Sequence, residues 1–170
     1  MIIHKIFICF INLSFLVVQG QAQDLNNQEL NSPTARYRVT FQSVWSNSTH
    51  PGAYPFNAHY SGLIGMTHNT DTKLFELGAL ASAGIISMAE TGSKSRLITE
   101  VNAAINAGTG QHLISGGSLG TSPASVSVEV NLEMSHSLVS ITSMIAPSPD
   151  WFTGVTRLDL RDGDGYVSSL

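Results

Sequence analysis

Between two apolar runs of the chain stands APSPDWFTG, residues 146–154. The runs on either side, 138–145 and 155–160, have the length and composition of strands. Two prolines this close together cannot both lie inside a strand ladder, because neither has a backbone N–H to donate. The chain is therefore predicted to turn here, and Gly154 is expected to let the backbone bend into the next strand. The turn presents one carboxylate, Asp150, beside a tryptophan.

The rest of the chain predicts more strands and one clear helix. Apolar and polar residues alternate over 37–45 and 126–132, which is typical of half-buried strands. Residues 94–107 place four apolar side chains on one helical face, and 74–89 is rich in small residues and predicts one or two helical turns. The glycine-rich segment 108–123 predicts a long surface loop. Together these patterns indicate an all-β fold, an antiparallel β-sandwich with short helical insertions.

The first 22 residues have the pattern of a signal peptide. Lys5 supplies a positive charge, 6–18 form an apolar core, and Gly20-Gln21-Ala22 provides the small residues that a signal peptidase reads. The core is shorter than the roughly 20 residues that a membrane span needs. We therefore predict cleavage after Ala22, a flexible polar leader over 23–34, and a single folded domain over 35–170.

Charge and cysteine content exclude several classes of function. Cleavage would remove Lys5, leaving 7 basic against 12 acidic residues, so the formal net charge would move from −4 to −5. Without a cluster of basic residues the chain is a poor partner for nucleic acid. The single cysteine, Cys9, lies within the predicted signal peptide. The mature chain is therefore predicted to have no disulfide, no cysteine nucleophile and no cysteine-based zinc site.

Several blocks of sequence, in the same order, resemble the N-terminal domain of spondins, the F-spondin and mindin type of extracellular matrix module. One block is Pro-Ser-Pro-Asp-Trp-Phe-Thr-Gly-Val, which includes the turn described above. The others precede it along the chain: Trp45-Ser46 with Thr49-His50-Pro51, Tyr60-Ser-Gly-Leu-Ile-Gly65 with His68, and Gly78 with Ala81-Ser-Ala-Gly84 and Ala89-Glu-Thr-Gly92. The resemblance extends over nearly the whole mature chain.

This resemblance implies a C2-like sandwich with a calcium ion held by loops at one end. In the family, the aspartate of Pro-Ser-Pro-Asp and two carboxylates of a later Asp-Ala-Gly-Thr-Asp motif bind the ion. The sequence stops at Leu170 before that motif, so the resemblance implies a C-terminally truncated domain with an incomplete calcium site. Only Asp150 is carried over as a metal ligand. Asp162 and Asp164 are candidates to substitute for the missing carboxylates, although a glycine-rich hairpin turn explains them better.

Three functions remain open from the sequence. The first is a secreted, non-enzymatic adhesion module that binds an extracellular protein or glycan, in the periplasm or at the cell surface if the host is bacterial. The second is a secreted metal-dependent hydrolase built from His68, Glu90 and Asp150. The third is a carbohydrate-binding sandwich, which an exposed row of Tyr54, Phe56 and Tyr60 would favour, although packing in the core explains these residues as easily. Asn47 begins an Asn-Ser-Thr sequon, which is a glycosylation site only in a suitable host.

Overall fold

The computed structural model describes residues 16–19, 34–147, 150–163 and 165–167. Most of the predicted signal peptide and leader lies outside these residues, as do Ser148 and Pro149 of the central turn and Asp164. For residues 16–19 the backbone alone is described.

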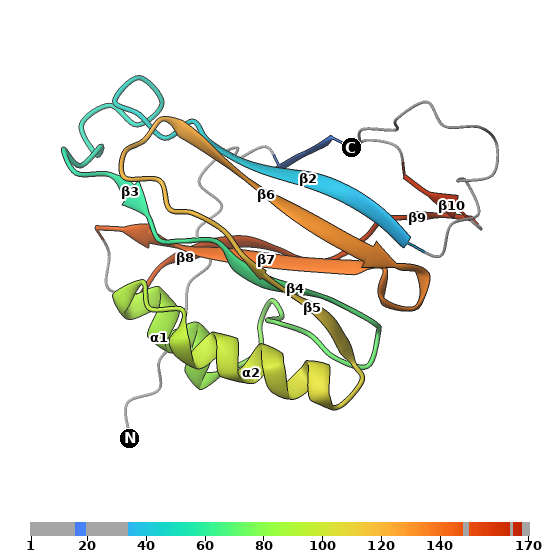
Figure 1. Cartoon of the computed structure of the whole chain (residues 1–170). Helices are drawn as coiled ribbons and strands as arrows, with labels where there is room; N and C mark the ends of the chain where they lie inside the picture. The colour runs from blue at the N-terminus through green and yellow to red at the C-terminus, as the bar shows by residue number, and fades with distance from the viewer. Residues whose placement is uncertain (1–15, 20–33, 148–149, 164, 168–170) are drawn as a thin grey trace.

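The chain forms two packed antiparallel sheets with two helices on the outer face of the second (Figure 1). The first sheet has the order β1-β2-β6, and the second has the order β3-β7-β4-β5 with β8 on β7. A small hairpin, β9 and β10, follows β8. The strands are β1 (Leu16–Gln19), β2 (Thr34–Ser43), β3 (His59–Tyr60), β4 (Ile64–His68), β5 (Gly110–Ser115), β6 (Ala124–Glu133), β7 (Leu138–Ala146), β8 (Phe152–Asp159), β9 (Arg161–Asp162) and β10 (Gly165–Tyr166). The predicted all-β sandwich with short helical insertions is confirmed.

Strand β7 organises the second sheet, as its apolar sequence leads one to expect of a strand covered on both faces. One of its edges pairs with β8, and the other pairs first with β4 and then with the short strand β3. Because β7 and β8 are antiparallel neighbours, the turn between them lies at one end of the sandwich. This is the turn that the two prolines predict.

The helices α1 (Ala83–Thr91) and α2 (Ser95–Asn106) cover the second sheet. The hydroxyl of Ser82 accepts a hydrogen bond from the N–H of Ile85 and caps α1, and Gly92, with a φ of 71°, ends it. The helix expected over 94–107 is confirmed as α2. The helix expected within 74–89 begins only at Ala83 and runs on to Thr91, and the residues before it form a loop.

Two apolar cores lie on opposite faces of the second sheet. The core between the sheets contains Tyr37, Val39 and Phe41 of β2 together with Val139, Ile141 and Ile145 of β7. The core beneath the helices contains Ile64, Met66, Ile85, Met88, Leu97, Val101 and Phe152, among others. Strand β7 is therefore covered twice, which explains why nearly all its residues are buried.

Two expectations from the glycines are wrong. Within the segment predicted as a loop, 108–123, residues Gly110–Ser115 form β5, an edge strand held by five residue pairs to β4. Gly154 lies inside β8 rather than at a bend, and a Cβ there would lie 2.4 Å from the carbonyl oxygen of Ile141. Close approach of two strands, and not a bend, requires this glycine.

Residues Leu16–Gln19, within the predicted signal peptide, form β1 on the edge of β2. Cleavage after Ala22, which stays a prediction, would remove this strand. Among the residues that the structure describes, no helix is long and apolar enough to cross a membrane.

Candidate functional site

Three loops meet at the end of the sandwich that carries the β7–β8 turn, and we call this region the Asp150 end. It comprises residues 44–58, 116–123 and the described residues of 147–151. Strand β3 joins the first loop to the third, because His59 pairs with Ala146, the last residue of β7. The second loop joins them through backbone hydrogen bonds between Tyr60 and Leu119.

The carboxylate of Asp150 is exposed at this end. It makes no hydrogen bond or ion pair with another described residue, and no group of three potential ligands is found in the described part of the chain. Calcium takes six to eight oxygen ligands, and the described residues of the Asp150 end include one carboxylate, that of Asp150. Asp162 cannot add a ligand to a site at Asp150. It follows the far end of the eight-residue β8, and at about 3.3 Å per residue the two ends of this strand are roughly 26 Å apart. Instead Asp162 pairs with Gly165 across the β9–β10 hairpin, as the hairpin interpretation predicts.

The aromatic residues of the Asp150 end divide into a supporting cluster and an exposed pair. Trp45 makes edge contacts with His50, Tyr54 and Tyr60, at ring-centroid distances of 6.4, 5.8 and 6.2 Å. Tyr60 is 5% exposed, so it packs in the core and does not form a surface row with Tyr54 and Phe56. Phe56 is 99% exposed and Trp151 is 40% exposed. These two side chains are the large apolar groups that this end offers to a partner.

Buried hydroxyl groups hold the loop that carries Phe56 against the loop 116–123. The Ser43 and Ser122 hydroxyls lie 2.6 Å apart, and Ser122 donates to the Trp45 carbonyl at 2.7 Å. The Tyr54 hydroxyl donates to the Ser122 carbonyl. Because these bonds join the loops 44–58 and 116–123 through groups that water does not reach, the supporting cluster is held in one arrangement.

His68 lies at the opposite end, where β4 ends beside the start of β7. Its ring is fully buried, and its Nδ1–H donates to the Asn69 carbonyl at 2.7 Å. Its Nε2 therefore accepts from the Ser140 hydroxyl at 2.8 Å, and Ser140 Oγ in turn accepts from the backbone N–H of Arg157 at 2.9 Å. We call His68, Ser140 and Arg157 the His68 node.

The electrostatics of the node favour neutral imidazole. Burial lowers the pKa of His68 below its usual value of 6.5, and the charges of Arg157 and His136 act in the same direction. Hydrogen bonds with the backbone of Asn69 and Thr72 oppose this shift without reversing it. At neutral pH the ring is therefore an uncharged part of the fold.

The node occupies an irregularity in the sheet. Val139 pairs with Leu158 and Ile141 with Val155, so two residues of β8 lie opposite Ser140. This is a β-bulge, in which Arg157 takes a φ of 56°, a left-handed conformation that is uncommon for a residue with a side chain. The Ser140 hydroxyl satisfies the N–H that the bulge would otherwise leave without a partner.

The residues proposed for a hydrolase lie apart. His68 is buried opposite Leu138 at one end of the nine-residue β7, whereas Asp150 lies beyond the other end. Glu90 is exposed in the last turn of α1 and makes no hydrogen bond or ion pair with the described residues. Ser140 and His68 do form a hydrogen-bonded pair, but both are inaccessible to solvent. A substrate has no access to them. His68, Glu90 and Asp150 therefore do not form the hydrolase site considered from the sequence.

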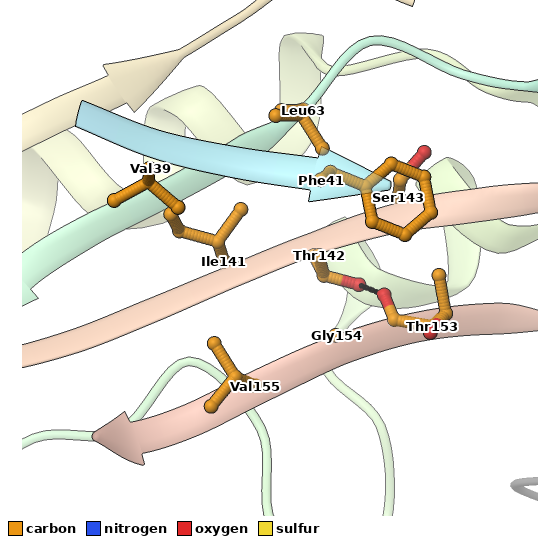
Figure 2. A pocket seen from close by; sticks show the side chains of 9 residues that line it. All are labelled: Val39, Phe41, Leu63, Ile141, Thr142, Ser143, Thr153, Gly154 and Val155. Carbon is orange, nitrogen blue, oxygen red and sulfur yellow. Dashed lines mark hydrogen bonds between the residues drawn. The ribbon is translucent and has the colours of Figure 1, made fainter. Parts of the chain in front are cut away.

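A cleft of about 240 Å³ opens between the two sheets on the β8 side (Figure 2). Val39, Phe41, Leu63, Ile141 and Val155 supply apolar walls, and none of the nine lining residues is titratable. Two of its hydroxyl groups are already engaged, since Thr142 Oγ1 donates to the Thr153 carbonyl and Ser143 Oγ to the Ser61 carbonyl. The cleft therefore offers apolar surface and no acid or base for catalysis.

Sequence reasoning singled out His68 but missed its partners. Ser140 lies in a run that predicts only a strand, and Arg157 lies where alternation predicts an ordinary strand residue. A bulge depends on how two strands pair, which neither strand shows alone. The polar residue Ser140 within an otherwise apolar buried strand is the one available signal.

Comparison with known proteins identifies the family. The Spondin_N family model matches residues 35–170. Human Spondin-2 is 34% identical over 165 residues, covering 94% of this chain and 49% of Spondin-2. Rat Spondin-2 is 35% identical over 81% of this chain and 43% of its own length, and bovine Spondin-1 is 34% identical over 81% of this chain and 18% of its own length.

The chain thus spans about half the length of Spondin-2 and a smaller part of Spondin-1. Both relatives are proteins of the extracellular matrix, and the match with the family model begins within β2 and includes both helices and every later strand. The chain belongs to the Spondin_N family, a family of extracellular proteins.

Proposed function

We propose that this chain is a secreted, non-enzymatic binding module of the extracellular matrix that contacts its partner with the Asp150 end. The observation that supports this most is the pair of exposed aromatic side chains at one end of the sandwich, Phe56 and Trp151, with the loop that carries Phe56 held by buried hydroxyl groups. Exposed aromatic residues on a rigid support are the groups that contribute most to protein–protein binding. The partner is therefore proposed to be a protein, with a matrix glycan as the alternative.

The test is retention of the purified chain on decellularised matrix. Replacing Phe56 by Ser is expected to weaken retention about tenfold, the effect of losing roughly 1.4 kcal/mol of binding free energy. Leu80→Ser is the matched control, because Leu80 is also an exposed apolar side chain, at 86%, but lies on the loop before α1. Equal retention of the Phe56 variant, or an equal loss in the Leu80 variant, would refute the proposal.

Treating the matrix before the assay distinguishes the two kinds of partner. If the partner is a protein, limited proteolysis of the matrix removes retention and glycosidase treatment leaves it unchanged. The reverse result would assign the Asp150 end to glycan binding. Loss of retention with neither treatment would show that the chain adheres without a specific partner.

Calcium binding at Asp150 is proposed only in combination with ligands from outside the described residues, since those residues supply one carboxylate. Calorimetric titration of the chain with calcium tests it. If the site forms, the heat of binding disappears in Asp150→Ala and persists in Asp162→Ala, because Asp162 lies at the far end of β8. Equal heats in the wild type and the Asp150 variant would exclude Asp150 as a ligand.

A further inference from the structure

The loop that follows β4 is held against β8 by contacts next to the His68 node. Arg157 Nη1 donates to the Thr70 carbonyl at 3.3 Å, and the hydroxyl of Thr156 donates to the Phe75 carbonyl at 2.9 Å. Phe75 also packs edge-on against Phe152, with ring centroids 5.2 Å apart. Residues 69–77, which we call the latch segment, are thus attached to β8 through residues at or next to the bulge.

His68 connects the latch segment to the sheet directly. Its Nδ1–H donates to Asn69, the first residue of the segment, and its Nε2 accepts from Ser140 on β7. The same Ser140 oxygen accepts a hydrogen bond from the backbone N–H of Arg157. One ring therefore links the start of the segment to the bulge that holds its later part.

The geometry points to an acid-sensitive latch: we propose that protonation of His68 releases residues 69–77 from β8. A proton on Nε2 removes the lone pair that accepts the Ser140 hydroxyl, so that hydroxyl must turn away. Its remaining acceptor is Thr156 Oγ1, at 3.5 Å, a long contact. Ser140 Oγ would then have to accept from both the imidazolium and Arg157.

The side chains around His68 give an imidazolium no compensation, and of the groups that act on the ring, the backbone hydrogen bonds with Asn69 and Thr72 are the ones that favour its charged form. The side-chain charges that act on His68 are those of Arg157 on β8 and His136 in the 3₁₀ turn Met134–His136, and both are cationic when charged. The charged residues of the latch segment, Asp71, Lys73 and Glu76, are not among the groups that shift its pKa, and neither are His112 on β5 and Asp159 on β8. A buried cation next to a guanidinium is destabilised by burial and by charge repulsion, and contact with water removes both effects.

The route to water leads through the latch segment. His68 is the last residue of β4, and the residue after it begins the segment, whereas the strands on both sides of β4 are paired along its length. Opening the segment exposes Leu74, now 7% exposed, and Phe75, next to Leu77, which is already 57% exposed. In acid the chain would therefore display an apolar surface that is covered at neutral pH.

The latch is tested by hydrogen exchange of the full chain at pH 7.5 and pH 5, measured by mass spectrometry. The labelling times at the two pH values are scaled to correct for the pH dependence of the intrinsic exchange rate. We expect protection of residues 69–77 to fall at least tenfold at pH 5, while β2 and β6 keep theirs. In His68→Gln, whose neutral amide can donate to Asn69 and accept from Ser140, protection should be the same at both pH values. His112→Gln is the matched control and should respond to acid as the wild type does.

A second measurement on the wild type avoids reliance on the folding of the variant. The titration of the His68 ring, followed by NMR, should have its midpoint below 6.5 and coincide with the loss of protection in residues 69–77. An unchanged segment at pH 5, an acid response that survives in the His68 variant, or a ring that titrates while the segment stays closed would each overturn the proposal.

Discussion

The two ends of β8 use polar side chains in opposite ways. At the His68 node the imidazole and the Ser140 hydroxyl are buried and partnered, and the groups of the node come from three different strands. At the Asp150 end the carboxylate and the Phe56 ring face solvent, and buried hydroxyl groups hold the loop that carries Phe56. A buried network fixes the fold, whereas exposed groups on a fixed support remain available to a partner.

The largest effect that would separate the two ends is expected from Ser140→Ala. Loss of the hydroxyl leaves His68 Nε2 and the Arg157 N–H without partners in a site that water does not reach. Each unsatisfied group costs about 1–3 kcal/mol, so we expect the free energy of unfolding to fall by roughly 2–4 kcal/mol. Urea unfolding measures it.

The matched control for that variant is Ser48→Ala at the Asp150 end. Ser48 is exposed and bonds to the neighbouring Ser46 hydroxyl, so its loss is expected to change stability by less than about 0.5 kcal/mol. If the two serine variants unfolded at the same urea concentration, the node would not be the structural element described here.

A smaller effect is expected at Arg157, whose φ of 56° a glycine adopts without strain. Arg157→Gly and Arg157→Ala both remove the guanidinium, so their difference isolates the backbone. The left-handed conformation costs a residue with a Cβ about 1–2 kcal/mol, partly offset by the greater unfolded-state entropy of glycine. The glycine variant should therefore be more stable than the alanine variant by about 1 kcal/mol, and the reverse order would show that the bulge carries no strain.

The smallest effect on stability is expected from Phe56→Ser. The side chain is 99% exposed and leaves no cavity when removed, so thermal melting should move by no more than a degree or two. Together with weakened retention on matrix, this result would show that Phe56 contributes to binding and not to stability. A large drop in melting temperature would instead make Phe56 part of the structural support.

The sequence predicts the framework better than the contacts between its parts. Alternation and apolar runs correctly predict β2, β6, β7 and the turn before Phe152, because these signals lie within one segment. The same rules miss β5, where glycines flank a short edge strand, and they misjudge Gly154, whose role depends on the approach of Ile141. His68 is visible as a motif residue, but its function in the node depends on a bulge between two other strands.

The Asp150 end shows the same limit. The sequence identifies Asp150 as a carboxylate on a turn, yet it does not decide whether Tyr60 and Phe56 lie on the surface or in the core. Tyr60 belongs to the core because β3 pairs with β7 and draws it inward. Exposure of an aromatic ring is a property of the tertiary structure, and the pattern of one loop does not determine it.

Hydrogen exchange of the chain while it is held on decellularised matrix tests the central claim most directly. We predict added protection in residues 44–58 and in the β7–β8 turn, with none in residues 69–82. Protection over 69–82, with the Asp150 end unchanged, would contradict this and would assign binding to the segment between β4 and α1.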